Sequence, residues 1–342
     1  METVEAMASA SLVSQHRNYE PKITIEDAYQ QCEEITRAAS TSFMRSFRYL
    51  DATRKRSVYA LYAFCRRADD IVDGDWQPDV DLSHLSTRAE DKALQMSVDR
   101  QSESSYPTTE FHSRVRALLW FHDNLDDIEA GRSVSHPIFI ALQDTLQRYP
   151  IRISDLRTLL EGMADDLFPT EYQTFEDMRS YCYKVASTVG LALIEIYGYT
   201  DPNAREHAEE MGIFLQMVNV LRDIEEDLER GRVYLPRQEL ERFGICVSEL
   251  NDPGLADTMR WQEFMRHYLH RTRTHSEQGM KLLPLLDRRA RKSPEMMCLV
   301  YGEILKEVER RRGDVLSSRV SLGFMRKIRF ALAALGLWSL AA

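Results

Sequence analysis

The sequence predicts an all-helical protein, and three observations support that prediction. Apolar residues recur at spacings of three and four along most of the chain, and no strand-like alternation is sustained. Only 14 glycines and 11 prolines interrupt the 342 residues. Helix starts are also marked, because residues 24–27 and 174–177 both have the sequence of a capping box. Asp201-Pro202 is expected to open a helix of about thirty residues that ends at Gly231.

The 342 residues, 44% of them hydrophobic, are enough for one large domain or two small ones. Because no internal repeat or domain boundary is evident, we expect a single domain over residues 1–342. Residues 1–22 are interpreted as an N-terminal extension. The polar, serine-rich segment 76–106 is interpreted as a flexible insertion. A formal net charge of −10 argues against binding to nucleic acid, because no basic excess is present to neutralise phosphates.

The cysteine content and the two ends of the chain bear on location. Five scattered cysteines without CxxC spacing predict neither a zinc site nor a disulfide framework, which favours a reducing cytoplasm. The first twenty residues lack the pattern of a signal peptide. Residues 330–342 are apolar but shorter than the roughly 20 residues that span a bilayer. Basic residues precede them, so we expect a cytoplasmic protein with weak association to a membrane surface.

Two segments carry acid residues at four-residue spacing. Asp69 and Asp73 form the first pair, and Asp223 and Asp227 form the second, with Asn219 one turn before it. Residues four apart lie one above the other on a helix, so each segment presents its oxygen ligands on one face. Hard divalent cations such as Mg²⁺ prefer oxygen ligands. The two segments therefore predict a magnesium site that binds a diphosphate.

Helical projection separates the polar face of each acid segment from its apolar face. Tyr62 and Arg66 share the face of the first acid pair, directly after the apolar run 58–65, and Gln216 shares the face of the second pair. A solvated helix face is the alternative interpretation. It is weakened because a helix that apolar is expected to be central, where unpaired carboxylates are costly. Arginines near the acids in the sequence are suited to phosphate oxygens, although each alone is more often a surface ion-pair partner: Arg66, Arg67, Arg222, Arg230 and Arg232.

A third segment, residues 181–190, combines Tyr181 and Val185 on one face with the small residues Ala186, Ser187 and Gly190. When a metal-bound diphosphate departs from an allylic substrate, the rest of the substrate becomes a carbocation. A carbocation needs a dry cavity and is stabilised by aromatic faces. Tyr181 has such an aromatic face, and the small residues permit the close approach of another helix. The alternative is a closely packed core helix without a catalytic function.

Taken together, residues 59–74, 181–190 and 219–236 resemble the squalene/phytoene synthase family, and the resemblance extends over roughly residues 25–332. Within that family the motif sequences are most similar to those of phytoene synthases, above all Cys-Arg-Arg-Ala-Asp-Asp-Ile-Val-Asp-Gly and Arg-Gly-Arg-Val-Tyr-Leu-Pro. The resemblance implies an isoprenoid synthase helical fold with a central apolar cavity. It implies the two acid motifs facing each other across the cavity mouth.

The resemblance also implies residue roles. Metal binding would fall to Asp69, Asp73, Asn219, Asp223 and Asp227, with Tyr181 and the four aspartates as catalytic residues. The substrate-binding set would be Ser40, Ser42, Phe43, Tyr62, Arg66, Val185, Gln216, Asn219, Arg222 and Arg232. The implied cofactor is Mg²⁺ or Mn²⁺, without NADPH.

The implied reaction joins two geranylgeranyl diphosphates head to head through prephytoene diphosphate to phytoene, the first step of carotenoid biosynthesis. A synthase that makes squalene, dehydrosqualene or presqualene diphosphate from farnesyl diphosphate is the nearest alternative. A non-enzymatic family relative is less well supported, because such a protein is expected to lose acids that are all present here. The residues predict no particular oligomeric state.

Overall fold

The computed structural model describes residues 23–39, 46–100 and 108–320. The larger helices are α2 (Ile25–Ala39), α4 (Ala52–Asp73), α5 (Ser86–Arg100), α6 (Thr108–Glu129), α7 (Pro137–Arg148), α8 (Ile153–Asp165), α9 (Phe175–Cys182), α10 (Thr188–Tyr197), α11 (Ala204–Arg222), α14 (Met259–Met280) and α15 (Lys292–Arg310). Shorter helical elements are η1 (Ser83–Leu85), η2 (Tyr183–Ser187), α12 (Ile224–Glu229), α13 (Arg237–Arg242), η3 (Val247–Asn251), η4 (Pro253–Asp257) and η5 (Leu283–Leu285). Two-residue strands β1 (Thr170–Glu171) and β2 (Arg232–Val233) pair in parallel. The predicted all-helical class is confirmed.

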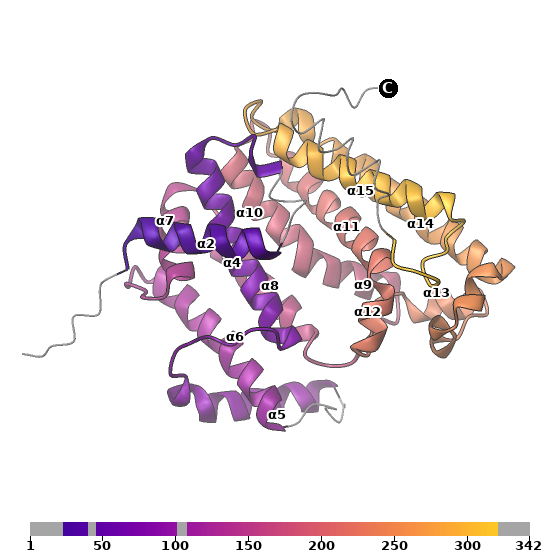
Figure 1. The fold of residues 1–342 in the computed structure, drawn as a ribbon, viewed down its shortest axis with the longest axis horizontal. Helices are drawn as coiled ribbons and strands as arrows, with labels where there is room; N and C mark the ends of the chain where they lie inside the picture. The colour runs from indigo at the N-terminus through magenta and orange to yellow at the C-terminus, as the bar shows by residue number, and fades with distance from the viewer. Residues whose placement is uncertain (1–22, 40–45, 101–107, 321–342) are drawn as a thin grey trace, which may run out of the picture.

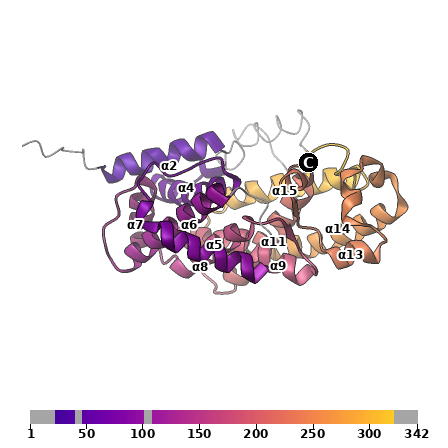
Figure 2. The ribbon, with the colours of Figure 1, turned by 90° about the horizontal axis from the view of Figure 1, so that it is seen from below.

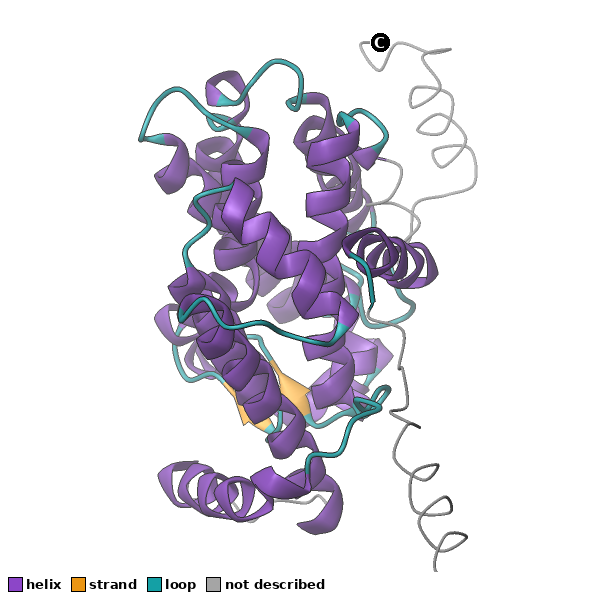
Figure 3. Ribbon diagram, turned by 90° about the vertical axis from the view of Figure 1, so that its left-hand side faces the viewer, coloured by secondary structure: helices purple, strands orange, loops and turns teal. Residues whose placement is uncertain are grey.

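The helices are arranged around α8, α10 and α11, which lie between an N-terminal group with α2, α4 and α7 and a C-terminal group with α14 and α15 (Figure 1). Seen at 90°, α2 lies along one face and α8 and α9 along the opposite one (Figure 2). Helices surround the short strand pair (Figure 3). The strand pair brings the end of α8 beside the segment that follows α12.

Local sequence signals place the helix ends. The predicted capping boxes are both present: Asp27 N donates to Thr24 Oγ1 at 3.1 Å, and Thr174 exchanges the equivalent bonds with Asp177. Helix α4 begins after Asp51, whose carboxylate accepts from the Arg54 amide at 3.0 Å. The starting points of α2, α4 and α9 are therefore encoded within a few residues.

The prediction of a single long helix that ends at Gly231 is wrong in two details. The helix begins at Ala204 rather than at Pro202, because Asp201 Oδ1 accepts from the Asn203 amide and forms a turn first. It is also interrupted at Asp223, where φ is −107° and ψ is 13°. Its predicted apolar stripe is nevertheless in the core, with Phe214, Met217, Leu221 and Ile224 buried and Leu228 packed against it.

Between α9 and α10, residues Tyr183–Ser187 form a π-helical turn rather than continuing the α-helix. Such turns are uncommon and often occur at functional sites. The predicted close approach of small residues is confirmed here, since a Cβ added to Gly212 of α11 would lie 2.4 Å from Ser187 Cα. The backbone of the π turn therefore packs directly against that of α11.

Segment 76–106 contains η1 and α5, and Leu85, Ala89 and Ala93 are buried. Helix α5 packs against α6. The described part of the segment is therefore helical from Ser83 to Arg100, and its flexibility stays a prediction. None of the described helices combines the length and apolar character that crossing a membrane requires. The predicted extension 1–22 and the apolar tail 330–342 lie outside the described residues.

Candidate active site

The first acid motif occupies the last turn of α4. Asp69 has a side chain that is 40% exposed and accepts from Arg66 Nη1 at 2.9 Å. Surrounding protein and the neighbouring charge of Asp73 raise the pKa of Asp69 to about 7. Asp73 is only 8% exposed and pairs with Arg232 at 2.9 Å and Arg230 at 3.1 Å. The two carboxylates therefore share one face, as predicted, and both are held by arginines.

The second acid motif lies at the break between α11 and α12. Asp223 Oδ1 accepts from Arg222 Nε at 2.8 Å and from Arg319 Nη2 at 2.7 Å. Arg319 also pairs with Glu226. Asp227 lies one turn further, and burial together with the charge of Asp223 raises its pKa to about 7. The predicted pair is present, with an arginine from the far end of the chain added to it.

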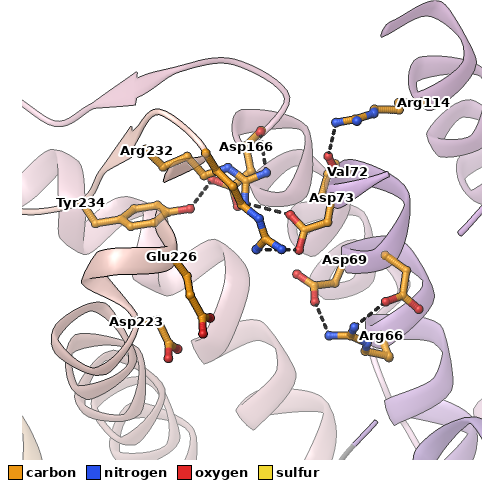
Figure 4. Close-up of polar contacts among 12 residues, drawn as sticks. Arg66, Asp69, Val72, Asp73, Arg114, Asp166, Asp223, Glu226, Arg232 and Tyr234 are labelled. Atoms are coloured by element: carbon orange, nitrogen blue, oxygen red, sulfur yellow. Dashed lines mark hydrogen bonds and ion pairs between the residues drawn. The ribbon is translucent and has the colours of Figure 1, made fainter. Parts of the chain in front are cut away.

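The two motifs converge on one space. Figure 4 shows Asp69 and Asp73 on one side, Asp223 on the other, and Arg232 between them. The charge of Asp166 contributes to the raised pKa of both Asp69 and Asp227, so both segments lie within electrostatic reach of the same buried carboxylate. The predicted facing arrangement of the acids is thus what the fold produces.

Behind this space lies a tyrosine cluster around Asp166, which is 5% exposed. The hydroxyls of Tyr181 and Tyr234 each donate to its carboxylate at 2.7 Å. The rings of Tyr181 and Tyr234 are stacked at 4.8 Å, and Tyr172 lies 5.4 Å from Tyr181. Burial raises the pKa of Asp166 to about 6, while the charge of Arg232 opposes that rise. Burial also raises the pKa of Tyr181 well above 10, which keeps its phenol neutral.

A polar group on α11 completes the second motif. Asn219 Nδ2 donates to Gln216 Oε1 at 3.1 Å. Among the described residues, Asn219 Oδ1 is buried and accepts no hydrogen bond. Burial raises the pKa of Tyr301 on α15, while Arg222 and Asn219 lower it. This phenol therefore lies beside both residues.

Val185 and Tyr62 are the remaining predicted site residues that lie within the described part of the chain. Val185 lies in the π turn and packs toward Gly162 of α8. Tyr62 lies on α4, one turn before Arg66, and contributes to the raised pKa of that arginine. Ser40, Ser42 and Phe43 lie outside the described residues. Among the described residues no cluster of three His, Cys, Asp or Glu side chains is arranged to hold a metal ion.

The site also contains residues that the sequence interpretation gave no role. Tyr234 stands in the quoted Arg-Gly-Arg-Val-Tyr-Leu-Pro segment, so its neighbours were the available signal. Tyr172, Tyr301 and Arg319 lie far from both acid motifs in the sequence and follow no local pattern. A small cavity of about 10 Å³ lies beside Asp227, lined mainly by apolar residues that include Val220 and Leu250. The long apolar cavity implied by the resemblance stays a prediction.

Comparison with known proteins identifies the family. The sequence model for squalene/phytoene synthase matches residues 36–326, which includes every motif of the site. The chain belongs to the squalene/phytoene synthase family. It is 30% identical to a 15-cis-phytoene synthase of Synechococcus elongatus over 89% of this chain and 91% of that protein. It is 31% identical to a phytoene synthase of Mycobacterium tuberculosis, over 91% of each chain.

Solved structures confirm the fold of this family member. A dehydrosqualene synthase in complex with ligand superimposes with a TM-score of 0.71 at 24% identity, covering 91% of this chain and 96% of that one. The squalene synthase HpnC from Alicyclobacillus acidocaldarius gives 0.68 at 23% identity, covering 84% and 95%. The predicted isoprenoid synthase fold is therefore confirmed, and the family membership makes this chain a prenyltransferase-type enzyme.

Proposed function

We propose that this family member is a phytoene synthase that joins two geranylgeranyl diphosphates through prephytoene diphosphate to phytoene and releases diphosphate. The observation that carries the proposal is the convergence of the two acid motifs on one space. Figure 4 shows Asp69 and Asp73 across from Asp223, and the charge of Asp166 acts on both Asp69 and Asp227. Phytoene synthases from cyanobacteria, mycobacteria and plants are among its relatives at about 30% identity. A plant example, the chloroplastic phytoene synthase 1 of Arabidopsis thaliana, is 30% identical over 88% of this chain and 64% of that protein.

The acid residues fit a divalent cation. Burial and, after it, the neighbouring carboxylates raise the pKa of Asp69 and Asp227 to about 7, and a cation relieves the repulsion between the carboxylates. Asn219 adds a buried oxygen that accepts no hydrogen bond among the described residues. We expect Asp69, Asp73, Asn219, Asp223 and Asp227 to hold Mg²⁺ or Mn²⁺. When bound, the cation neutralises the charge of the departing diphosphate.

The arginines have a second role in this proposal. Arg66 pairs with Asp69, Arg232 with Asp73, and Arg319 with Asp223. A guanidinium binds a phosphate as readily as a carboxylate and in the same bidentate geometry. When the carboxylates take up cations, these arginines are free to turn to phosphate oxygens. Arg222 is expected to join them from the end of α11.

The tyrosine cluster is suited to the carbocation that ionisation leaves. The rings of Tyr172 and Tyr181 both stack on Tyr234 and present aromatic faces. Burial raises the pKa of Tyr181 and Tyr234 well above 10, so these two phenols add no charge that would trap the cation. Asp166 accepts from two of the hydroxyls and so fixes the orientation of both rings. Apolar residues of α4, α9 and α11 exclude water from this region.

The second candidate is condensation of two farnesyl diphosphates to squalene, dehydrosqualene or presqualene diphosphate. It is favoured by the structural similarity to a dehydrosqualene synthase and to a squalene synthase. Both candidates use the same acid motifs, and they differ in the chain length of the substrate. Squalene formation also consumes a hydride from NADPH, which the phytoene reaction does not need.

Product analysis separates the candidates. Purified protein is incubated with Mg²⁺ and either the C20 or the C15 diphosphate, with and without NADPH, and products are identified by mass. We expect a C40 hydrocarbon from the C20 substrate, unaffected by NADPH and lost in EDTA. If the C15 substrate gives a C30 product and the C20 substrate gives none, the phytoene proposal is contradicted. Asp69→Ala and Asp223→Ala should abolish turnover, whereas Asp123→Ala, which removes a surface pair with Arg88, should not.

We further propose that the protein associates weakly with the cytoplasmic face of a membrane, since its substrate and product are lipids. The support is the apolar segment 330–342 with the basic residues before it. Sedimentation with anionic liposomes is expected for the full chain and reduced for a chain that ends at residue 329. Equal sedimentation of the two chains contradicts the proposed role of the tail.

A further inference from the structure

Arg114 of α6 is bonded to the last turn of α4, beside the first acid motif but outside the residues assigned so far. Its side chain is 7% exposed, and Nη1 donates to the carbonyl oxygen of Val72 at 2.7 Å. The same guanidinium pairs with Glu110, one turn earlier on α6. Figure 4 shows Arg114 reaching Val72 from a different side than Arg232 reaches Asp73. The end of α4 is therefore held from two directions.

The backbone bonds at this helix end explain why an arginine is needed. A helix leaves its last carbonyl oxygens without helical partners. Gly74 N donates to the carbonyls of Asp70 and Ile71, and Asp75 N donates to Asp70 at 2.8 Å. None of these amides reaches Val72, so Arg114 supplies the donor for that buried carbonyl. A cation is also the favourable charge at a helix C-terminus.

The fit between Arg114 and α4 is close enough to fix the position of the turn. Gly74 has φ of +83°, and a Cβ at this residue would lie 2.5 Å from Arg114 Nη2. The guanidinium therefore packs directly against the Gly74 backbone. On the same helix, Phe111 meets Phe168 at 5.2 Å, two residues beyond Asp166. Helix α6 thus touches both the first acid motif and the turn that carries the buried carboxylate.

We propose that Arg114 is a positioning residue for the first acid motif. It acts through Val72 and fixes the direction in which Asp69 and Asp73 point, and so the affinity of the site for a divalent cation with diphosphate. The inference rests on the proposed function, because it assigns these two aspartates to that ligand. Groups that orient metal ligands from behind commonly change metal affinity by about 10- to 100-fold when removed.

The test uses Arg114→Met and Arg114→Lys, with Arg54→Met as a matched control. Arg54 has the same arrangement at the end of α10: Nε donates to the Ile196 carbonyl at 3.2 Å, and Nη2 pairs with Asp287 at 2.6 Å. Its glycine neighbour, Gly198, has φ of +81°. Arg54 lies on α4 about 27 Å from Val72 along the helix axis. It is therefore a partly buried capping arginine remote from the acids, with a side chain that is 19% exposed.

Two measurements are made on each full-length protein. Calorimetric titration with Mg²⁺ and inorganic diphosphate gives affinity without turnover, and the rate at varied Mg²⁺ gives the half-saturating concentration. We expect Arg114→Met to lower the affinity and to raise the half-saturating Mg²⁺ concentration, each by about tenfold or more. Arg114→Lys keeps the charge and a donor, so it should recover part of the loss. Arg54→Met should lower the melting temperature and leave both quantities within twofold of the wild type.

The outcomes are distinguishable. Unchanged affinity in Arg114→Met, or an equal loss in Arg54→Met, overturns the positioning role while wild-type turnover leaves the proposed function in place. Wild-type protein that neither binds the ligand nor makes product overturns the proposed function itself. If Arg114→Met is too unstable at the assay temperature, the titrations are repeated at a lower temperature at which it stays folded, and wild-type affinity there overturns the inference.

Discussion

Asp227→Asn is expected to stabilise the metal-free protein while abolishing turnover. Burial, together with the charge of Asp223, raises the pKa of this carboxyl from 3.8 to about 7. Because the folded pKa lies above the unfolded one, the penalty for the charge is absent below pH 4 and complete above pH 7. About three pKa units at 1.36 kcal/mol each give an upper limit near 4 kcal/mol. Water in the partly exposed site reduces this to about 2–4 kcal/mol.

The amide has the shape of the carboxylate without its charge, so it should recover that free energy at pH 8. With about 2.1 cal/mol/K of unfolding entropy per residue over 342 residues, the melting temperature should rise by about 3–6 °C. The assay is thermal melting in EDTA at pH 5 and pH 8. At pH 5 the gain should be less than half as large. Asp123→Asn, on the surface, is the control. A gain that is absent at pH 8, or equal at both pH values, refutes the reasoning.

Three further predictions concern the surroundings of the acids. Gly212→Ala places a Cβ 2.4 Å from Ser187 Cα, so the π turn must move, and denaturant titration should show a loss of about 1–3 kcal/mol. Tyr234→Phe removes a charge-assisted bond to Asp166 and should cost about 1.5–3 kcal/mol of unfolding free energy; a product mixture identical to that of the wild type would count against its position near the reacting carbons. Arg319→Ala should raise KM for the prenyl diphosphate about tenfold or more, as expected for one lost bond to a charged group, and an unchanged KM would leave Arg319 as a structural partner of the second motif alone.

Local periodicity was enough to predict the all-helical class and the faces of the acid motifs. The apolar stripe of α11 and the pairing of Asp69 with Asp73 follow from the 3.6-residue repeat, and both are present in the structure. The capping boxes at Thr24 and Thr174 were equally predictable, because their bonds close within three residues. The predictions of these features are correct because each feature depends only on residues within one or two helical turns.

Features with a non-local cause were not predictable in the same way. The break at Asp223 accompanies ion pairing with Arg319, which lies 96 residues later. The π turn is packed against Gly212 of another helix. The bond from Tyr234 to Asp166 spans 68 residues. Helical projection contains no information on which distant segment approaches a given face, so these contacts depend on the assembled fold.

The two acid motifs differ in how firmly the fold holds them, and this difference bears on the chemistry. Asp73 sits on an unbroken helix whose end is held through the backbone by Arg114 and through its carboxylate by Arg232, both nearly buried. Asp223 sits where a helix is interrupted, and its distant partner Arg319 is half-exposed. Exposed ion pairs contribute little stability, so the second motif can exchange its arginine for a ligand at small cost. The first motif then serves as the fixed reference, and the second adjusts to the diphosphate.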